Sequence, residues 1–136
     1  GQTMAYNVML VDDSATVRDV ISKTLQLADL PIGELHEAAN GAEALDLLQH
    51  HWIDIVFADI NMPIMNGIEM VDQMSKDGIL ASIPVVIVST DGSTTRMEQL
   101  MAKGVRAYVR KPFTPELLHR VVSDVLQPQE DDNDDS

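Results

Sequence analysis

The chain lacks cysteine and has no long hydrophobic run, and each absence excludes a class of protein. With no cysteine among its 136 residues, it can form neither a disulfide nor a thiolate metal site. No apolar run approaches the ~18 residues that span a bilayer, and no signal-peptide pattern opens the sequence. We therefore expect a cytoplasmic protein that does not bind a membrane.

Basic residues are also scarce, since nine Lys and Arg stand against 22 Asp and Glu, giving a formal net charge of −13. This balance opposes binding to nucleic acid, whose phosphates normally call for a basic face. Five of the acids lie between Glu130 and Asp135. A terminal run of like charges repels itself, so residues 128–136 are predicted to be a disordered acidic tail.

The chain before residue 128 fits one domain with a substantial core. Hydrophobic residues make up 45% of the sequence, which argues against wholesale disorder, and the length suits a single domain. Gly1, Gln2 and Thr3 before Met4 are interpreted as a cloning remnant. We expect an N-terminal extension over residues 1–5, a domain over 6–127 and the tail over 128–136.

Short apolar runs alternate along the domain with segments of helical period. The runs predict strands at 8–11, 34–39, 53–58, 85–88 and 107–109. The first helix is expected to bury one apolar stripe, made of Val17, Val20, Ile21, Leu25 and Ala28. Asn40 with Glu43 is typical of a capping box, and Thr114 with Pro115 of a cap and first helical residue. Five strands and five helices predict an α/β fold with a doubly wound parallel sheet.

Polar side chains follow four of these strands. Asp12 and Asp13 come after the first, Asp59 after the third, Ser89 after the fourth and Lys111 after the fifth. Carboxyl ends of parallel strands meet at one edge of the sheet, where ligand sites of such folds lie. The sequence therefore predicts that these side chains share one site.

Three neighbouring carboxylates repel one another unless a cation neutralises them. The donors are hard oxygens, so Mg²⁺ is the expected occupant. Asp13 alone could equally cap a helix, and Lys111 alone could be a surface lysine; their joint placement favours a site. Asp59 fits a nucleophile that forms an acyl phosphate, with Ser89 and Lys111 neutralising charge. No general base is evident, which suits a long-lived covalent state.

Four segments resemble the receiver domain of two-component response regulators: Leu10-Val11-Asp12-Asp13-Ser14, the run from Asp59 to Gly67, the run from Pro84 to Ser89, and Lys111-Pro112-Phe113. The resemblance covers residues 8–126 and is nearest to the single-domain CheY-like members. It implies a flavodoxin-like five-stranded sheet in the order 2-1-3-4-5. The Lys111–Pro112 bond is a candidate cis peptide, although trans is the commoner state.

The resemblance also implies a role for each site residue. Asp59 would be the phosphoacceptor. Asp13 and Asp59 would bind Mg²⁺ directly with the backbone carbonyl of Asn61, and Asp12 would act largely through water. Lys111 would pair with a phosphoryl oxygen.

Two further residues would form the switch: Ser89 would turn toward the phosphoryl group, and Tyr108 would move inward with it. Alone, Tyr108 also fits a half-buried strand tyrosine. Asn61 and Asp91 would flank the path of the attacking water, and Thr90 could narrow that path.

The implied partners are a sensor histidine kinase or phosphotransfer protein, and a downstream target protein. The target would bind the face formed by the fourth helix, fifth strand and fifth helix, where Arg96 and Arg106 lie. The protein would be no enzyme beyond its own phosphoryl transfer and dephosphorylation. Its four histidines, His36, His50, His51 and His119, are interpreted as surface or partly packed residues.

Three alternatives stay open on the sequence alone. An aspartate-nucleophile phosphatase would have a second Asp where Asn61 stands, and it would need room for a cap. The chain could be a receiver fragment of a larger regulator with an output domain, although a stand-alone protein is favoured. It could also be a constitutive interaction module, which the full set of acids, Ser89 and Lys111 argues against.

Overall fold

A computed structural model describes residues 5–126 of the chain. Its centre is one sheet of five parallel strands in the order β2-β1-β3-β4-β5. The strands are β1 (Tyr6–Val11), β2 (Ile32–Ala38), β3 (Ile55–Ala58), β4 (Val85–Ser89) and β5 (Ala107–Arg110). The predicted doubly wound sheet and its strand order are confirmed.

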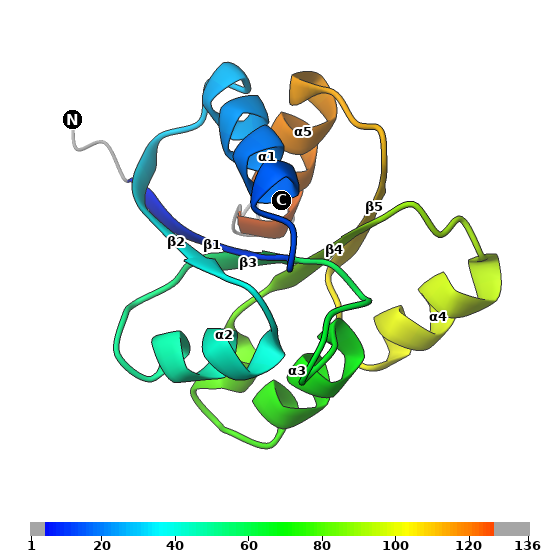
Figure 1. The fold of residues 1–136 in the computed structure, drawn as a ribbon. Helices are drawn as coiled ribbons and strands as arrows, with labels where there is room; N and C mark the ends of the chain where they lie inside the picture. The colour runs from blue at the N-terminus through cyan, green and yellow to red at the C-terminus, as the bar shows by residue number, and fades with distance from the viewer. Residues whose placement is uncertain (1–4, 127–136) are drawn as a thin grey trace, which may run out of the picture.

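Five α-helices connect and follow the strands, as the sequence predicts. They are α1 (Ala15–Leu27), α2 (Gly41–Leu48), α3 (Gly67–Ser75), α4 (Thr94–Ala102) and α5 (Pro115–Leu126). A short 3₁₀ turn, η1 (Leu80–Ser82), precedes β4 and was not predicted. Figure 1 shows α1 and α5 on one face of the sheet and α2, α3 and α4 on the other. Both faces are therefore covered.

The central strands explain why the sequence reads there as continuous apolar runs. Along β1, Val8 and Leu10 belong to the core cluster under α1 and α5, whereas Met9 and Val11 belong to the cluster on the opposite face. All four side chains are at most 1% exposed. A parallel strand with two covered faces has no polar side, so its sequence does not alternate between apolar and polar residues.

Local expectations at the helices need two corrections. Val20 is 50% exposed, so the buried stripe of α1 is narrower than predicted. The Asn40 side chain accepts from the Glu43 N–H, but Glu43 accepts from Ala39 rather than from Asn40. The predicted capping box is therefore only half formed, because the Glu43 side chain binds the backbone N–H one residue before Asn40. Thr114 does cap α5, accepting from the Leu117 N–H.

A complete capping box stands instead at the start of α3. The Asn66 side chain accepts from the backbone of Glu69, and the Glu69 side chain accepts from the backbone of Asn66. The two bonds satisfy donors that a helix start otherwise leaves unpaired. They fix where α3 begins, directly after the loop that follows β3.

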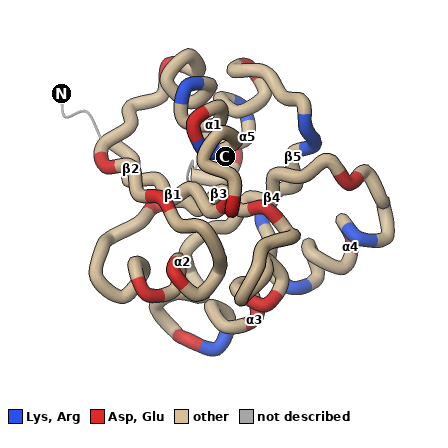
Figure 2. The backbone as a smooth tube through the Cα atoms, in the orientation of Figure 1, with Lys and Arg blue, Asp and Glu red and all other residues tan. Residues whose placement is uncertain are grey.

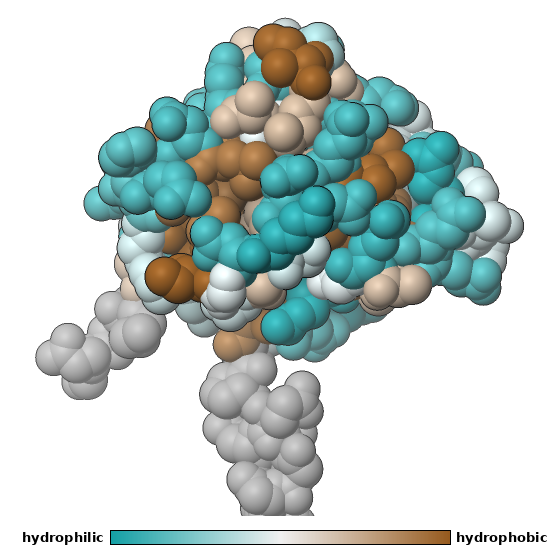
Figure 3. Space-filling view, turned by 90° about the horizontal axis from the view of Figure 1, so that it is seen from below, coloured by the Kyte–Doolittle hydropathy of each residue, from teal (hydrophilic) through white to brown (hydrophobic). Residues whose placement is uncertain are grey.

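The predicted acidic tail and nearly all of the predicted N-terminal extension lie outside the described residues. Among residues 5–126, no helix has both the length and the apolar character needed to cross a membrane. Figure 3 views the molecule from the side on which Figure 1 places α2 and α3, and shows a largely hydrophilic surface with separate hydrophobic patches.

Candidate functional site

The sheet brings three aspartates to one edge. Asp12 and Asp13 follow the end of β1, and Asp59 follows the end of the neighbouring β3. Backbone bonds extend the ladder past both strand ends: the Asp12 N–H donates to Ala38, and the Asp59 N–H donates to Val11. Figure 2 shows acidic positions in red beside these strand ends. The predicted gathering of the three acids is therefore observed.

The three carboxylates are close but differently exposed. One oxygen from each of Asp12, Asp13 and Asp59 lies within 4.8 Å of the others. Asp12 is 3% exposed, Asp59 is partly buried and Asp13 is exposed. The Asp12 carboxylate accepts from the Ser14 N–H at 2.9 Å, and that of Asp59 accepts from the Ile60 N–H at 2.8 Å. A carboxylate can accept about four hydrogen bonds, so Asp12 and Asp59 each retain lone pairs for a cation.

Burial raises the pKa of Asp12 above its ordinary value, and the negative charges of Asp59 and Asp13 raise it further. The Ser14 N–H and the Lys111 ammonium act in the opposite direction, but they do not cancel the rise. A carboxyl whose charged form is disfavoured in this way gains from any nearby cation.

The donor set fits a divalent hard cation. All three side chains offer carboxylate oxygens, and Asp13 remains open to solvent, so a bound ion could keep several waters. Mg²⁺ favours that combination of few carboxylates and retained water. Asn61, the fourth predicted ligand, lies exposed in the loop after β3, where its backbone carbonyl is two residues from Asp59.

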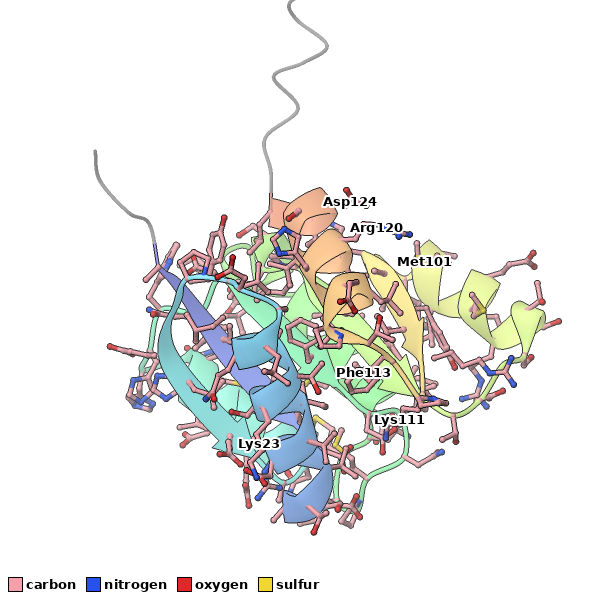
Figure 4. All side chains as sticks on the ribbon, turned by 90° about the horizontal axis from the view of Figure 1, so that it is seen from above. Lys23, Met101, Lys111, Phe113, Arg120 and Asp124 are labelled. Atoms are coloured by element: carbon pink, nitrogen blue, oxygen red, sulfur yellow. The ribbon has the colours of Figure 1, made fainter. Side chains whose placement is uncertain are left out.

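Lys111 supplies positive charge at the same edge. Its Nζ lies 3.8 Å from Asp12 Oδ2, and its backbone N–H donates to the Ser89 carbonyl at 2.9 Å. The Lys111–Pro112 peptide bond is cis, the alternative that the sequence leaves open. Figure 4 shows Lys111 at the end of β5. The lysine is thus held beside the acids by the chain that leaves β5.

The two predicted switch residues meet through a third. Ser89 is 3% exposed, and its Oγ accepts from the Asp91 N–H at 3.1 Å. The Tyr108 hydroxyl donates to the Asp91 carbonyl at 2.6 Å. Tyr108 itself is half-buried against the core cluster beneath α2, α3 and α4. A movement of the Ser89 hydroxyl would therefore disturb the same peptide segment that holds Tyr108.

The chain matches the response regulator receiver domain over residues 8–123. It belongs to this family. A chemotaxis protein CheY homolog of Campylobacter jejuni is 36% identical over 120 residues, which cover 88% of this chain and 91% of that protein. The solved chemotaxis response regulator CheY4 of Vibrio cholerae is 33% identical with a TM-score of 0.80, and the match covers 90% of this chain and 100% of that one.

The chain also matches longer response regulators. Response regulator Rre1 of Synechocystis is 34% identical over 128 residues, which are 94% of this chain but 54% of that protein. Receiver domains serve two-component signal transduction and are signalling proteins rather than conventional enzymes.

Two residues that hold the receiver site were given no role from the sequence, although Gly67 ends one of the motifs. Gly67 donates its N–H to the Ile60 carbonyl at 2.8 Å, and a Cβ on Gly67 would lie 2.3 Å from the Asp59 carbonyl oxygen. A glycine after a strand-end Asp was the available signal. The Arg18 guanidinium donates to the Asp12 carbonyl and to Glu37 Oε1, the latter at 2.7 Å. Nothing in the spacing of Arg18 indicates those partners.

We expect Gly67→Ala to lower the free energy of unfolding by at least about 2 kcal/mol, because the new methyl group collides with backbone rather than with a movable side chain. Gly78→Ala is the matched control, since a Cβ there meets nothing within 4 Å, and its effect should stay within about 1 kcal/mol. Urea denaturation measures both. Equal effects of the two substitutions would contradict the close packing of Gly67.

Asp12→Asn should raise the free energy of unfolding at neutral pH in the absence of divalent cations. A raised folded-state pKa means that the native state holds its proton more tightly, so the wild type loses stability as pH rises through that pKa. Asparagine carries no charge and escapes this loss. The advantage of the variant should shrink as pH falls, and urea unfolding over a pH series measures it. A variant less stable than the wild type at neutral pH would contradict the argument.

Proposed function

We propose that this receiver takes a phosphoryl group on Asp59 from a histidine kinase or phosphotransfer protein and then switches a partner-binding face. The observation that supports it best is the joint placement of Asp59 beside two further acids and Lys111. A carboxylate oxygen of Asp59 would attack phosphorus, the acyl phosphate bond would form, and the bond to the donor's imidazole nitrogen would break. The imidazole leaves with the electron pair of that bond.

The charges of the site suit this transfer. Asp13, Asp59 and the carbonyl of Asn61 would hold Mg²⁺, with Asp12 acting largely through water. When bound, the ion supplies the positive charge that lets an anionic phosphoryl group approach carboxylates. Lys111 would leave Asp12, from which it is 3.8 Å away, and pair with a phosphoryl oxygen. Asp59 would remain oriented by its bond from the Ile60 N–H.

The switch would follow from the hydrogen bonds at Asp91. A phosphoryl oxygen would accept from the Ser89 hydroxyl, and as this side chain turns toward the phosphoryl group its Oγ would move away from the Asp91 N–H, which would lose its acceptor. The loop that carries Asp91 would then shift, and Tyr108 would lose the carbonyl that now fixes its hydroxyl. The phosphoryl group thus biases two packings of the same segment, which is a population shift rather than a new fold.

The face that changes would be made by α4, β5 and α5. Tyr108 lies on β5, Arg106 is exposed just before it, and Arg96 lies in the first turn of α4. We propose a downstream target protein as the partner of this face. The positive charges of Arg96 and Arg106 favour acidic groups on that target.

Mg²⁺-dependent phosphorylation of the whole chain tests the proposal. Incubation with acetyl phosphate and Mg²⁺ should add the mass of one phosphoryl group, measured by intact-mass spectrometry. Asp59→Ala should abolish the gain. Asp19→Ala is the matched control and should retain it, because Asp19 is exposed and pairs with Lys23 on the surface. Absence of the adduct from the wild type, with rapid trapping of a short-lived species, would favour a constitutive interaction module.

Thr90 is expected to control how long the phosphoryl group persists. It is exposed directly after Ser89, and we infer that its methyl and hydroxyl groups narrow the path of the attacking water. Thr90→Ala should therefore accelerate dephosphorylation, by roughly the 10-fold that 1.4 kcal/mol of barrier represents. The decay of the phosphorylated mass after removal of acetyl phosphate measures the rate. An unchanged rate would eliminate this role for Thr90.

A further inference from the structure

Among residues 5–126, a second group of acidic and histidine side chains shares no residue with the three aspartates. Glu34 and His36 are two residues apart on β2, so they point to the same face of this edge strand. His51 reaches them from the segment between α2 and β3. Two imidazoles and a carboxylate from separate parts of the chain therefore meet at one place.

The possible metal-donor atoms of Glu34, His36 and His51 lie close together. His36 Nε2 lies 2.9 Å from Glu34 Oε1, and the rings of His36 and His51 have centroids 4.2 Å apart with an interplanar angle of 34°. One donor atom from each of the three side chains lies within 4.8 Å of the other two. Tetrahedral Zn²⁺ with ligands at about 2.0–2.1 Å needs donors roughly 3.4 Å apart. Small side-chain rotations would close that difference.

The backbone on both sides of the group is fixed by the fold. His36 lies opposite Met9 in the ladder between β2 and β1, and Met9 is fully buried. The His51 N–H donates to the Leu47 carbonyl at 3.0 Å, which ties it to the last turn of α2. That carboxyl-terminal end of a helix carries partial negative charge and has no basic residue in its last turn. A cation is favoured there.

We propose that Glu34, His36 and His51 form a binding site for a divalent transition-metal ion of the Zn²⁺, Ni²⁺ and Cu²⁺ class. Imidazole nitrogen is a ligand that these ions prefer, whereas Mg²⁺ prefers the all-oxygen set at Asp12, Asp13 and Asp59. The ion would replace the hydrogen bond between Glu34 and His36. Three protein ligands leave a coordination position for water, since Glu34 and His51 are exposed.

The two sites share no residue, and Glu34 and His36 lie within the edge strand β2 rather than after the end of a strand. Asp12 and Asp59 follow the carboxyl ends of their strands, whereas His51 precedes the amino end of β3. Because the ligand sets are separate, we expect a transition metal to bind the Glu34 site whether or not Asp59 is phosphorylated. It would fasten the edge strand β2 to the end of α2.

Trp52 provides a local reporter for this site. It is the only tryptophan in the chain, it follows His51 directly and it is 70% exposed. Its indole N–H donates to Asp54 Oδ1 at 3.1 Å, which holds the ring in place. Ni²⁺ and Cu²⁺ quench indole fluorescence at short range, so occupancy can be followed without any activity assay.

The test titrates the full chain with NiCl₂ in excess Mg²⁺, following Trp52 fluorescence, and repeats the titration with ZnCl₂ by calorimetry. We expect saturable binding with one equivalent. His36→Ala and His51→Ala should each weaken it at least about 10-fold, because loss of even an outer-shell partner costs that much. His50→Ala and His119→Ala are matched controls and should bind as the wild type does. Circular dichroism confirms that each variant is folded.

Three results would overturn the proposal. Binding that survives in both His36→Ala and His51→Ala would assign the ion to other groups, such as the carboxylates of residues 130–135. Equal weakening in His50→Ala or His119→Ala would indicate nonspecific histidine binding. If Ni²⁺ does not quench the fluorescence and Zn²⁺ produces no heat of binding, the three side chains do not bind these ions.

Discussion

The crowding of three carboxylates at one edge of the sheet is the constraint on which the site depends. Asp12 is almost fully buried, and its pKa is raised by burial and by the charges of Asp59 and Asp13. The receiver therefore holds an arrangement that is electrostatically unfavourable by itself and that a cation relieves. Lys111 gives partial relief at 3.8 Å. A site balanced in this way is sensitive to a change of local charge, which is what the proposed phosphorylation switch requires.

The fold maintains this crowding through its backbone. Parallel strands β1 and β3 end side by side, and the bond from the Asp59 N–H to Val11 continues their ladder into the site. Gly67 brings the start of α3 against the Asp59 peptide, at a distance that no side chain allows. The buried apolar strands beneath are covered on both faces, so the acids cannot separate without disrupting the core. Stability of the sheet thus supports an unfavourable local charge arrangement.

Much of this could be predicted because parallel sheets place strand ends together. Apolar runs and the polar residues after them indicate the sheet, its edge and the positions of Asp12, Asp13, Asp59, Ser89 and Lys111. Side-chain contacts that do not follow from shared strand ends could not be predicted. The partners of Arg18, the role of Asp91 between Ser89 and Tyr108, and the meeting of His36 with His51 depend on side-chain packing. The exposure of Val20 likewise depends on where α5 and β2 leave α1 uncovered.

The most direct test of the account is the dependence of folding stability on Mg²⁺. If the crowded acids form a cation site, the free energy of unfolding should rise with Mg²⁺ concentration as binding to the native state alone requires. Asp13→Asn should remove most of that rise, while Asp72→Asn, which pairs with Lys103 on the surface, should retain it. A wild type whose stability does not change with Mg²⁺, or an equal rise in Asp13→Asn, would contradict the account.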